Sequence, residues 1–130
     1  MHSKKAITAT VVAGLGEGAF FMSMQHYQKE IRDELGFVAY PGTLNLKVPK
    51  NKTKFFFNTT PIKIKGYKTQ KRIFGGASCY KARIKNIEGS IIIPDISKHK
   101  KDIIEFIAPV HLKSKLNIKD GDKVRIELSK

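Results

Sequence analysis

The alternation of apolar and polar residues predicts short β-strands along most of the chain. Such runs occupy residues 5–12, 43–48, 71–84, 88–94, 103–109 and 118–128. Residues two apart share one face of a strand, so each run has one side suited to a core. Residues 24–35 differ, because Tyr27, Ile31 and Leu35 form a stripe with helical spacing. Many short strands with one principal helix predict a mainly β protein, a small β-barrel.

Capping residues and breakers set the expected limits of these elements. Ser23 is a candidate N-cap for the helix, and Gly36 is a candidate C-terminal stop. The short apolar run at 20–23 is expected to form a second strand, and 110–117 a single helical turn. Residues 49–69 are rich in Lys, Asn and Thr and are expected to form short strands or a long lysine-rich excursion.

The size and composition of the chain limit its class. A length of 130 residues favours a single domain covering 1–130. Cys79 is the only cysteine, which excludes a disulfide framework and a thiolate metal site and favours a reducing, cytoplasmic setting. No apolar run approaches the roughly 18 residues of a membrane span. The first residues are expected to form a mature strand and not a signal peptide.

The net charge of +14 is the most unusual feature of the composition. Lys and Arg total 25 against 11 for Asp and Glu, and no acid occurs between Glu34 and Glu88. Such a charge attracts polyanions, either nucleic acid or the phosphates of a nucleotide. The alternative is a solvated lysine-rich surface, which we favour on charge alone because charge is only an electrostatic footprint.

Three glycines in GLGEGA, residues 14–19, indicate a loop that can approach a ligand closely. Glycine lets backbone N–H groups turn inward as an anion nest. The stretch also satisfies G-x-G-x-x-G/A. That dinucleotide fingerprint needs a helix beginning inside the glycines and a later strand ending in an acid, whereas Glu34 ends the expected helix. A tight turn between two hairpin strands is the alternative.

Thr43 and Asn45 place two polar side chains on one face of the strand at 43–48. The preceding Pro41-Gly42 suits a type II turn. Their Cα atoms are expected about 6.6 Å apart, at about 3.3 Å per residue, so the two oxygens can share one Mg²⁺ ion. Two neutral ligands bind Mg²⁺ weakly, so the metal is expected to arrive with a nucleotide. The alternative is the polar outer face of an ordinary strand.

Glu105 is an acid inside the apolar strand 103–109. A buried carboxylate is costly unless it is paired, and such residues cluster at functional sites, where Glu105 can accept a proton from a substrate hydroxyl. Periodicity equally allows Glu105 to face solvent. The histidines show no metal-ligand spacing, and Cys79 is expected to be buried and inert.

Three short segments occur in this order along the chain: GLGEG at 14–18, PGTLN at 41–45 and EFIAP at 105–109. With LGF at 35–37 and LNIKDGDKV near the C-terminus, they resemble the archaeal-type CTP-dependent riboflavin kinases over essentially the whole chain. The resemblance implies a closed cradle-loop β-barrel like that of riboflavin kinases. It also implies transfer of the γ-phosphoryl group of CTP to the 5′-hydroxyl of riboflavin, giving FMN and CDP.

The resemblance further implies a role for each matching residue. Thr43 and Asn45 would bind Mg²⁺, and Glu105 would be the catalytic residue. Glu105 and Ser97, which stands where threonine is expected, would contact the ribityl end of the flavin or the product phosphate. Residues expected to contact the nucleotide are Leu15, Gly16, Glu17, Gly18, Ala19, Phe20, Val110, His111, Leu112 and Lys113. Lys113 stands in place of an arginine and would act as a point charge.

We therefore expect a monomeric, cytoplasmic riboflavin kinase that uses CTP and Mg²⁺, contacts no membrane and attracts nucleic acid only non-specifically. A second hypothesis is a basic β-barrel that binds DNA. Its support is the charge of +14 and the ending GDKVRIEL, which is similar to swapped-hairpin transcription regulators. Those regulators are usually much shorter and need neither the glycine loop nor the Thr43–Asn45 pair.

Overall fold

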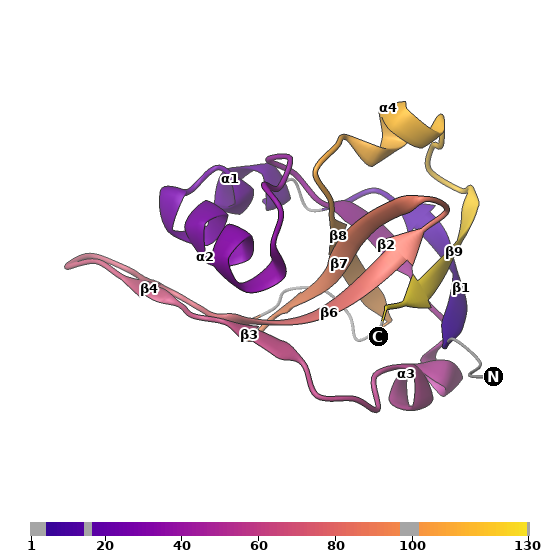
Figure 1. The fold of residues 1–130 in the computed structure, drawn as a ribbon, viewed down its shortest axis with the longest axis horizontal. Coiled ribbons are helices and arrows are strands. Elements are labelled where there is room, and N and C mark those ends of the chain that lie inside the picture. Colours follow the sequence, from indigo (N-terminus) through magenta and orange to yellow (C-terminus); the bar gives the residue numbers. More distant parts are fainter. Residues whose placement is uncertain (1–4, 15–16, 97–101, 130) are drawn as a thin grey trace.

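The chain folds into a small β-barrel with helices at its margins (Figure 1). The computed structural model describes residues 5–14, 17–96 and 102–129. The barrel strands are β1 (Ala6–Val12), β2 (Leu44–Lys47), β6 (Ala77–Ile84), β7 (Ile87–Pro94), β8 (Ile103–Ile107) and β9 (Lys123–Leu128). These six antiparallel strands close in the order β6-β7-β8-β2-β1-β9, because β9 pairs with both β1 and β6. The expected closed, mainly β barrel is confirmed.

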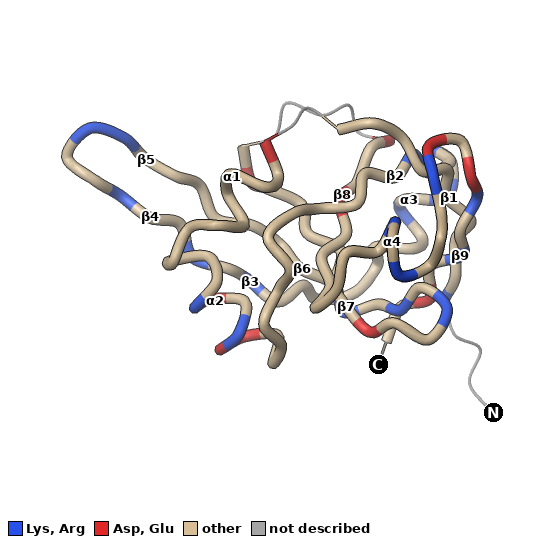
Figure 2. Tube along the Cα trace, turned by 90° about the horizontal axis from the view of Figure 1, so that it is seen from above, with Lys and Arg blue, Asp and Glu red and all other residues tan. Residues whose placement is uncertain are grey.

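The remaining elements surround this barrel. They are α1 (Gly18–Met22), α2 (Gln25–Leu35), β3 (Ile62–Ile64), α3 (Lys50–Phe56), β4 (Tyr67–Lys68), β5 (Ile73–Phe74) and α4 (Leu112–Leu116). Strand β3 pairs with β6, while β4 and β5 form a hairpin that projects away from the barrel (Figures 1 and 2). In the described residues α2 is the longest helix, as expected, and no helix is both long and apolar enough to cross a membrane.

Two apolar clusters hold these elements together. The first fills the barrel with alternate residues of its strands, including the fully buried Leu46, Phe106 and Ile126. The second lies beneath α1 and α2, where the predicted stripe of α2 packs against β3, β6 and β7. Burial of each large aliphatic side chain contributes about 1.5 to 3 kcal/mol, so both clusters are substantial.

The structure corrects the expected elements around residue 20. Residues 20–23 were expected to form a strand, but Gly18–Met22 form the helix α1, because a run of four apolar residues carries no usable period. The expected Ser23 N-cap is also wrong. The Ser23 hydroxyl donates to the Ala19 carbonyl at 2.6 Å and ends α1, while Met24 occupies the N-cap of α2. Gly36 ends α2 with φ 86°, as expected.

Two further corrections concern the segments on either side of β2. Pro41-Gly42 makes no type II turn, since Gly42 lacks positive φ and its N–H donates to the Tyr40 carbonyl at 2.8 Å. The segment 49–69 contains β3 as a short strand but also the helix α3, which was not expected. Lysine is a good helix former, and the buried Phe56 anchors α3 to the barrel core.

Adjacent phenylalanines of α3 allow a matched test of this anchor. Phe56 is 2% exposed and Phe55 is 69% exposed. Phe56→Ala should lower the free energy of unfolding by about 3 to 5 kcal/mol through the cavity it leaves. Phe55→Ala should change it by less than about 1 kcal/mol. Urea denaturation followed by circular dichroism measures both, and equal effects would contradict the packing described for α3.

Cys79 supplies a second test of the core. It lies in β6 at 1% exposure, and burial raises the pKa of its thiol to about 12. The native protein at pH 8 therefore holds almost no thiolate and should react very slowly with a disulfide-exchange reagent, whereas urea-unfolded protein should react at once. Because the thiol ionises more easily when unfolded, stability should also fall as the pH rises above about 9. Rapid stoichiometric labelling of native protein would contradict this burial.

Candidate active site

A cavity of about 490 Å³ lies between α1, the strands β2 and β8, and the segment that leads into α4. Its volume falls within the range of small-molecule sites. The predicted site residues that line it are Glu17, Gly18, Ala19, Thr43, Asn45, Glu105, Val110, His111, Leu112 and Lys113. Glu17 and Lys113, which are 96 positions apart in the sequence, therefore meet at one cavity.

Among the described residues, one predicted site residue does not line the cavity. Phe20 belongs to α1, but its side chain is 55% exposed and does not line the cavity. Leu15, Gly16 and Ser97 lie outside the described residues.

Pairing of β2 with β8 brings the polar residues of the cavity together. Asn45 lies directly opposite Glu105 in the register of the two strands. The Thr43 hydroxyl donates to Glu105 Oε1 at 2.7 Å, and all three side chains are half-buried. Glu105 therefore faces the cavity beside the Thr43–Asn45 pair, which forms part of a polar wall and not an ordinary outer face of a strand.

The glycine loop packs directly on this polar wall. A Cβ atom added to Gly14 would collide with the side chain of Asn45, and one added to Gly18 would collide with Thr43 Oγ1. A side chain at either position would therefore have to displace Asn45 or Thr43 from its present place. The chain then enters α1, so the alternative of a turn between two hairpin strands is wrong.

The oxygens of Thr43 and Asn45 are chemically suited to a hard cation. Asn45 Oδ1 is buried and has no hydrogen-bond partner, although buried polar atoms normally have one. Thr43 gives its hydroxyl hydrogen to Glu105, which leaves its oxygen lone pairs available. Among the described residues, no three His, Cys, Asp or Glu side chains cluster to hold a metal. A cation here would therefore rely on these neutral oxygens and on ligand oxygens, as Mg²⁺ commonly does.

The cavity carries little of the protein's positive charge. Lys113 is the one lysine or arginine among the described residues that line it, and its Nζ lies 2.9 Å from Asp120 Oδ1. Glu17 and Glu105 line the same cavity. Figure 2 shows lysines and arginines concentrated instead on the β4–β5 hairpin and around α3, β1 and β9.

Sequence reasoning missed several residues of the opposite wall. Gly75 and Gly76 line the cavity, although the Gly-Gly pair indicated only a break between two strands. The Tyr27 hydroxyl donates to the Gly75 carbonyl at 2.6 Å, and burial raises the pKa of Tyr27, which keeps this donor protonated. Tyr40 also lines the cavity, with its ring 5.1 Å from that of His111. No local sequence signal distinguishes Tyr40 from any exposed tyrosine.

Comparison with known proteins agrees with this geometry. The family model CTP-dep_RFKase, described as domain of unknown function DUF120, matches residues 11–128. Three similar curated proteins, each named riboflavin kinase, come from Pyrococcus abyssi (47% identity over 124 residues), Archaeoglobus fulgidus (42% over 125) and Pyrobaculum calidifontis (40% over 125).

Each of these three matches covers 94% of this chain but only 58%, 54% and 59% of the relative, so the chain spans a little over half of their length. The resemblance indicated by the ordered motifs is confirmed. With its closed barrel and this match along nearly all its length, the chain belongs to the family of CTP-dependent riboflavin kinases, CTP-dep_RFKase.

Proposed function

We propose that this protein transfers the γ-phosphoryl group of CTP to the 5′-hydroxyl of riboflavin, giving FMN and CDP. The observation that carries the proposal is the group formed by Thr43, Asn45 and Glu105, which lines one cavity in close contact with Gly14 and Gly18. The family name and the names of the relatives supply the substrates. The same family match favours a kinase over a swapped-hairpin DNA-binding regulator.

The residues of the polar wall have complementary tasks in this proposal. Thr43 and Asn45 hold Mg²⁺, which when bound neutralises charge on the transferred phosphoryl group. Glu105 orients the riboflavin hydroxyl or accepts its proton, and its carboxylate already accepts one hydroxyl hydrogen, from Thr43. Phosphoryl transfer depends mainly on positioning and on charge neutralisation, so a rigid cross-strand pair is a suitable support.

The nucleotide occupies the side of the cavity formed by the glycine loop and by residues 110–113. Backbone N–H groups of the loop donate to its phosphates, and the glycines allow the close approach that this requires. Lys113 exchanges Asp120 for a phosphate oxygen as a point charge. The exposed salt bridge between these residues is worth only about 0.2 to 1 kcal/mol, so the exchange costs little.

A panel of donors tests the reaction directly. The protein is incubated with riboflavin, Mg²⁺ and each nucleoside triphosphate in turn, and FMN is measured by chromatography. FMN should form with CTP and at far lower rates with ATP, GTP or UTP. FMN with ATP alone would overturn the choice of CTP, and no FMN with any donor would overturn the kinase proposal.

Substitution of Thr43 tests the metal site with a built-in control. Thr43→Val removes the hydroxyl and keeps the shape, and should lower turnover at limiting Mg²⁺ by about tenfold to a hundredfold. Thr43→Ser should retain most activity, and Thr8→Val, on the outer face of β1, should retain all of it. Asn45→Leu should lose turnover without loss of thermal stability, because it removes a buried acceptor that has no partner. Full activity of Thr43→Val and Asn45→Leu would exclude the proposed metal ligands.

A further inference from the structure

The positive charge of the protein is not accounted for by the cavity. Lys113 alone among the described lysines and arginines lines that cavity, although the chain has a net charge of +14. Cations lie instead on the β4–β5 hairpin, on α2 and α4, and on the side of the barrel formed by β9, β1, β2 and α3 (Figure 2). This last side of the barrel has the properties of a binding surface.

Cross-strand pairing arranges the cations on this side of the barrel in rows across β9, β1 and β2. Lys123 and Lys47 each lie directly opposite Thr10, on either side of β1, so the three side chains form one row on the outer face. Lys123 Nζ donates to Thr10 Oγ1 at 3.3 Å. Arg125 follows in the next outward row, opposite Thr8. We name this surface the β1 basic face; it consists of Thr10, Lys47, Lys123 and Arg125 on the outer side of the barrel, with Lys5 and Phe55 at the end where β1 begins.

The carboxylates near this face contact residues other than its cations. Within the described part of the chain, no carboxylate lies within ion-pairing distance of Lys47, Lys123 or Arg125. Glu127, the next outward residue of β9, pairs with Arg83 at 3.7 Å. Asp122 accepts the backbone N–H of Lys119 at 2.9 Å. The face therefore presents positive charge that the protein itself does not neutralise.

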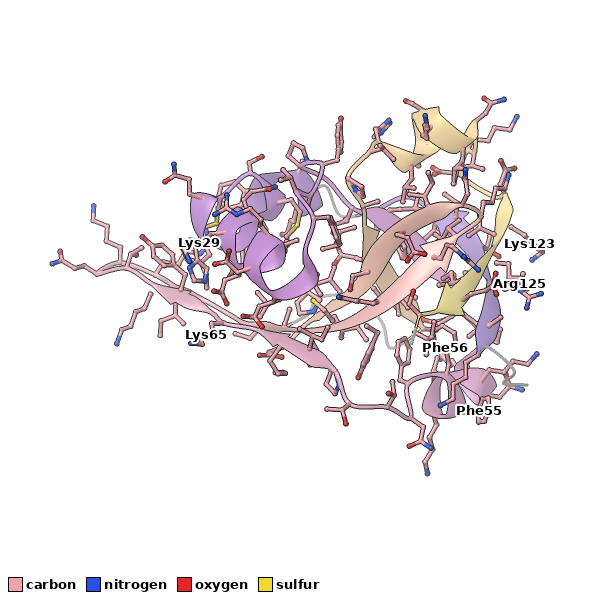
Figure 3. All side chains as sticks on the ribbon, in the orientation of Figure 1. Lys29, Phe55, Phe56, Lys65, Lys123 and Arg125 are labelled. Carbon is pink, nitrogen blue, oxygen red and sulfur yellow. The ribbon has the colours of Figure 1, made fainter. Side chains whose placement is uncertain are left out.

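An exposed aromatic ring completes the β1 basic face. Phe55 is 69% exposed at the end of α3, while its neighbour Phe56 points into the core (Figure 3). Lys5 Nζ lies 5.0 Å from the centre of the Phe55 ring and donates to the Asn58 carbonyl at 3.2 Å. An aromatic ring that is largely open to solvent and lies beside a lysine offers a surface on which a nucleobase can stack.

The dimensions of the face suit a short length of nucleic acid. From Lys5 to Thr10 the chain advances about 17 Å at about 3.3 Å per residue. Stacked nucleotides advance about 3.4 Å each, so this length corresponds to about five nucleotides. Single-strand binding surfaces built on β-barrels commonly span about 4 to 16 nucleotides.

We propose that the β1 basic face binds single-stranded nucleic acid, with the phosphates on Lys47, Lys123 and Arg125 and one base on Phe55. The face is the outer side of barrel strands with only the short helix α3 at one end, so it presents no long helix that could lie in a major groove, which favours a single strand over a duplex. A membrane is a poorer partner, because Phe55 is the only large apolar side chain in this face and lipid binding needs a broad apolar surface.

The β4–β5 hairpin is a natural control for this proposal. It is also basic, with the exposed cations Lys68, Lys71 and Arg72. Its aromatic rings are already partly covered, because Tyr67 is stacked on His26 at 5.1 Å and on Phe74 at 6.1 Å, and Arg72 lies over the Phe74 ring. A partner attracted by charge alone should not distinguish the hairpin from the β1 basic face.

Two triple variants make that comparison at equal charge. K47Q/K123Q/R125Q alters the β1 basic face and K68Q/K71Q/R72Q alters the hairpin, and each removes three positive charges. Binding of a fluorescein-labelled oligothymidylate of about 16 nucleotides is measured by anisotropy at several salt concentrations. The first variant should weaken binding at least about tenfold and reduce the slope of log K against log salt by about 2. The hairpin variant should change binding less than about threefold. Equal losses, or no loss in the first variant, would overturn the proposal.

Phe55 separates a nucleic acid from other polyanions. Phe55→Ala should weaken oligothymidylate binding about fivefold or more and leave binding of inorganic polyphosphate, which has no bases, unchanged. Ile73→Ala, at another apolar side chain that is 68% exposed, should alter neither. Equal losses for both polyanions would overturn base stacking. If Phe55→Ala reduced only the binding of phosphatidylserine vesicles, the face would be a lipid surface and the proposal would be wrong.

Discussion

Pairing of β9 with both β1 and β6 is the constraint on which the rest of the structure depends. It converts a sheet with two edges into a closed barrel, so that register can no longer slip at any one strand without disturbing every other strand. The register of β2 against β8 is thereby fixed, and with it the position of Asn45 opposite Glu105. The chemistry of the cavity is therefore a consequence of barrel closure, although no residue of β9 lines the cavity.

The polar wall of the cavity is organised for a ligand at some expense of stability. A buried acceptor without a partner, such as Asn45 Oδ1, costs about 1 to 3 kcal/mol relative to a satisfied one. The glycines at 14 and 18 add backbone entropy to the unfolded chain, yet a side chain at either position would displace Asn45 or Thr43. Among the described residues nothing in the cavity offsets these costs, whereas a cation and phosphates bound as proposed would satisfy the Asn45 oxygen and the loop together. A local conflict of this kind is typical of functional sites.

The parts of the site that could be predicted from the sequence are those set by the alternation of residues within one strand. Alternation of residues along β2 placed Thr43 and Asn45 on one face, because that relation is local to a single strand. It could not establish which way Glu105 faces, since this depends on the pairing of β8 with a strand about 60 residues earlier. The helices α1 and α3 were missed for a related reason. These helices have five and seven residues, and each is held by one buried side chain, Met22 in α1 and Phe56 in α3. One buried residue per helix gives no repeating pattern of apolar residues from which a helix could be predicted.

Screening by salt decides how the charge of the protein relates to its cavity. The Debye length is about 10 Å at 0.1 M salt, so exposed lysines act on an anion mainly where they lie near it. Lys47, Lys123 and Arg125 are exposed on the outside of the barrel, and the hairpin that carries the other group extends away from it (Figure 2). Neither group can replace local contacts within the cavity, where Lys113 is the one described cation. In the proposed function, a nucleotide in the cavity would therefore be held by backbone N–H groups, by Lys113 and by the neutral oxygens of Thr43 and Asn45. The charge of the exposed lysines and arginines lies on other surfaces, where it can act on a polyanion only by close contact.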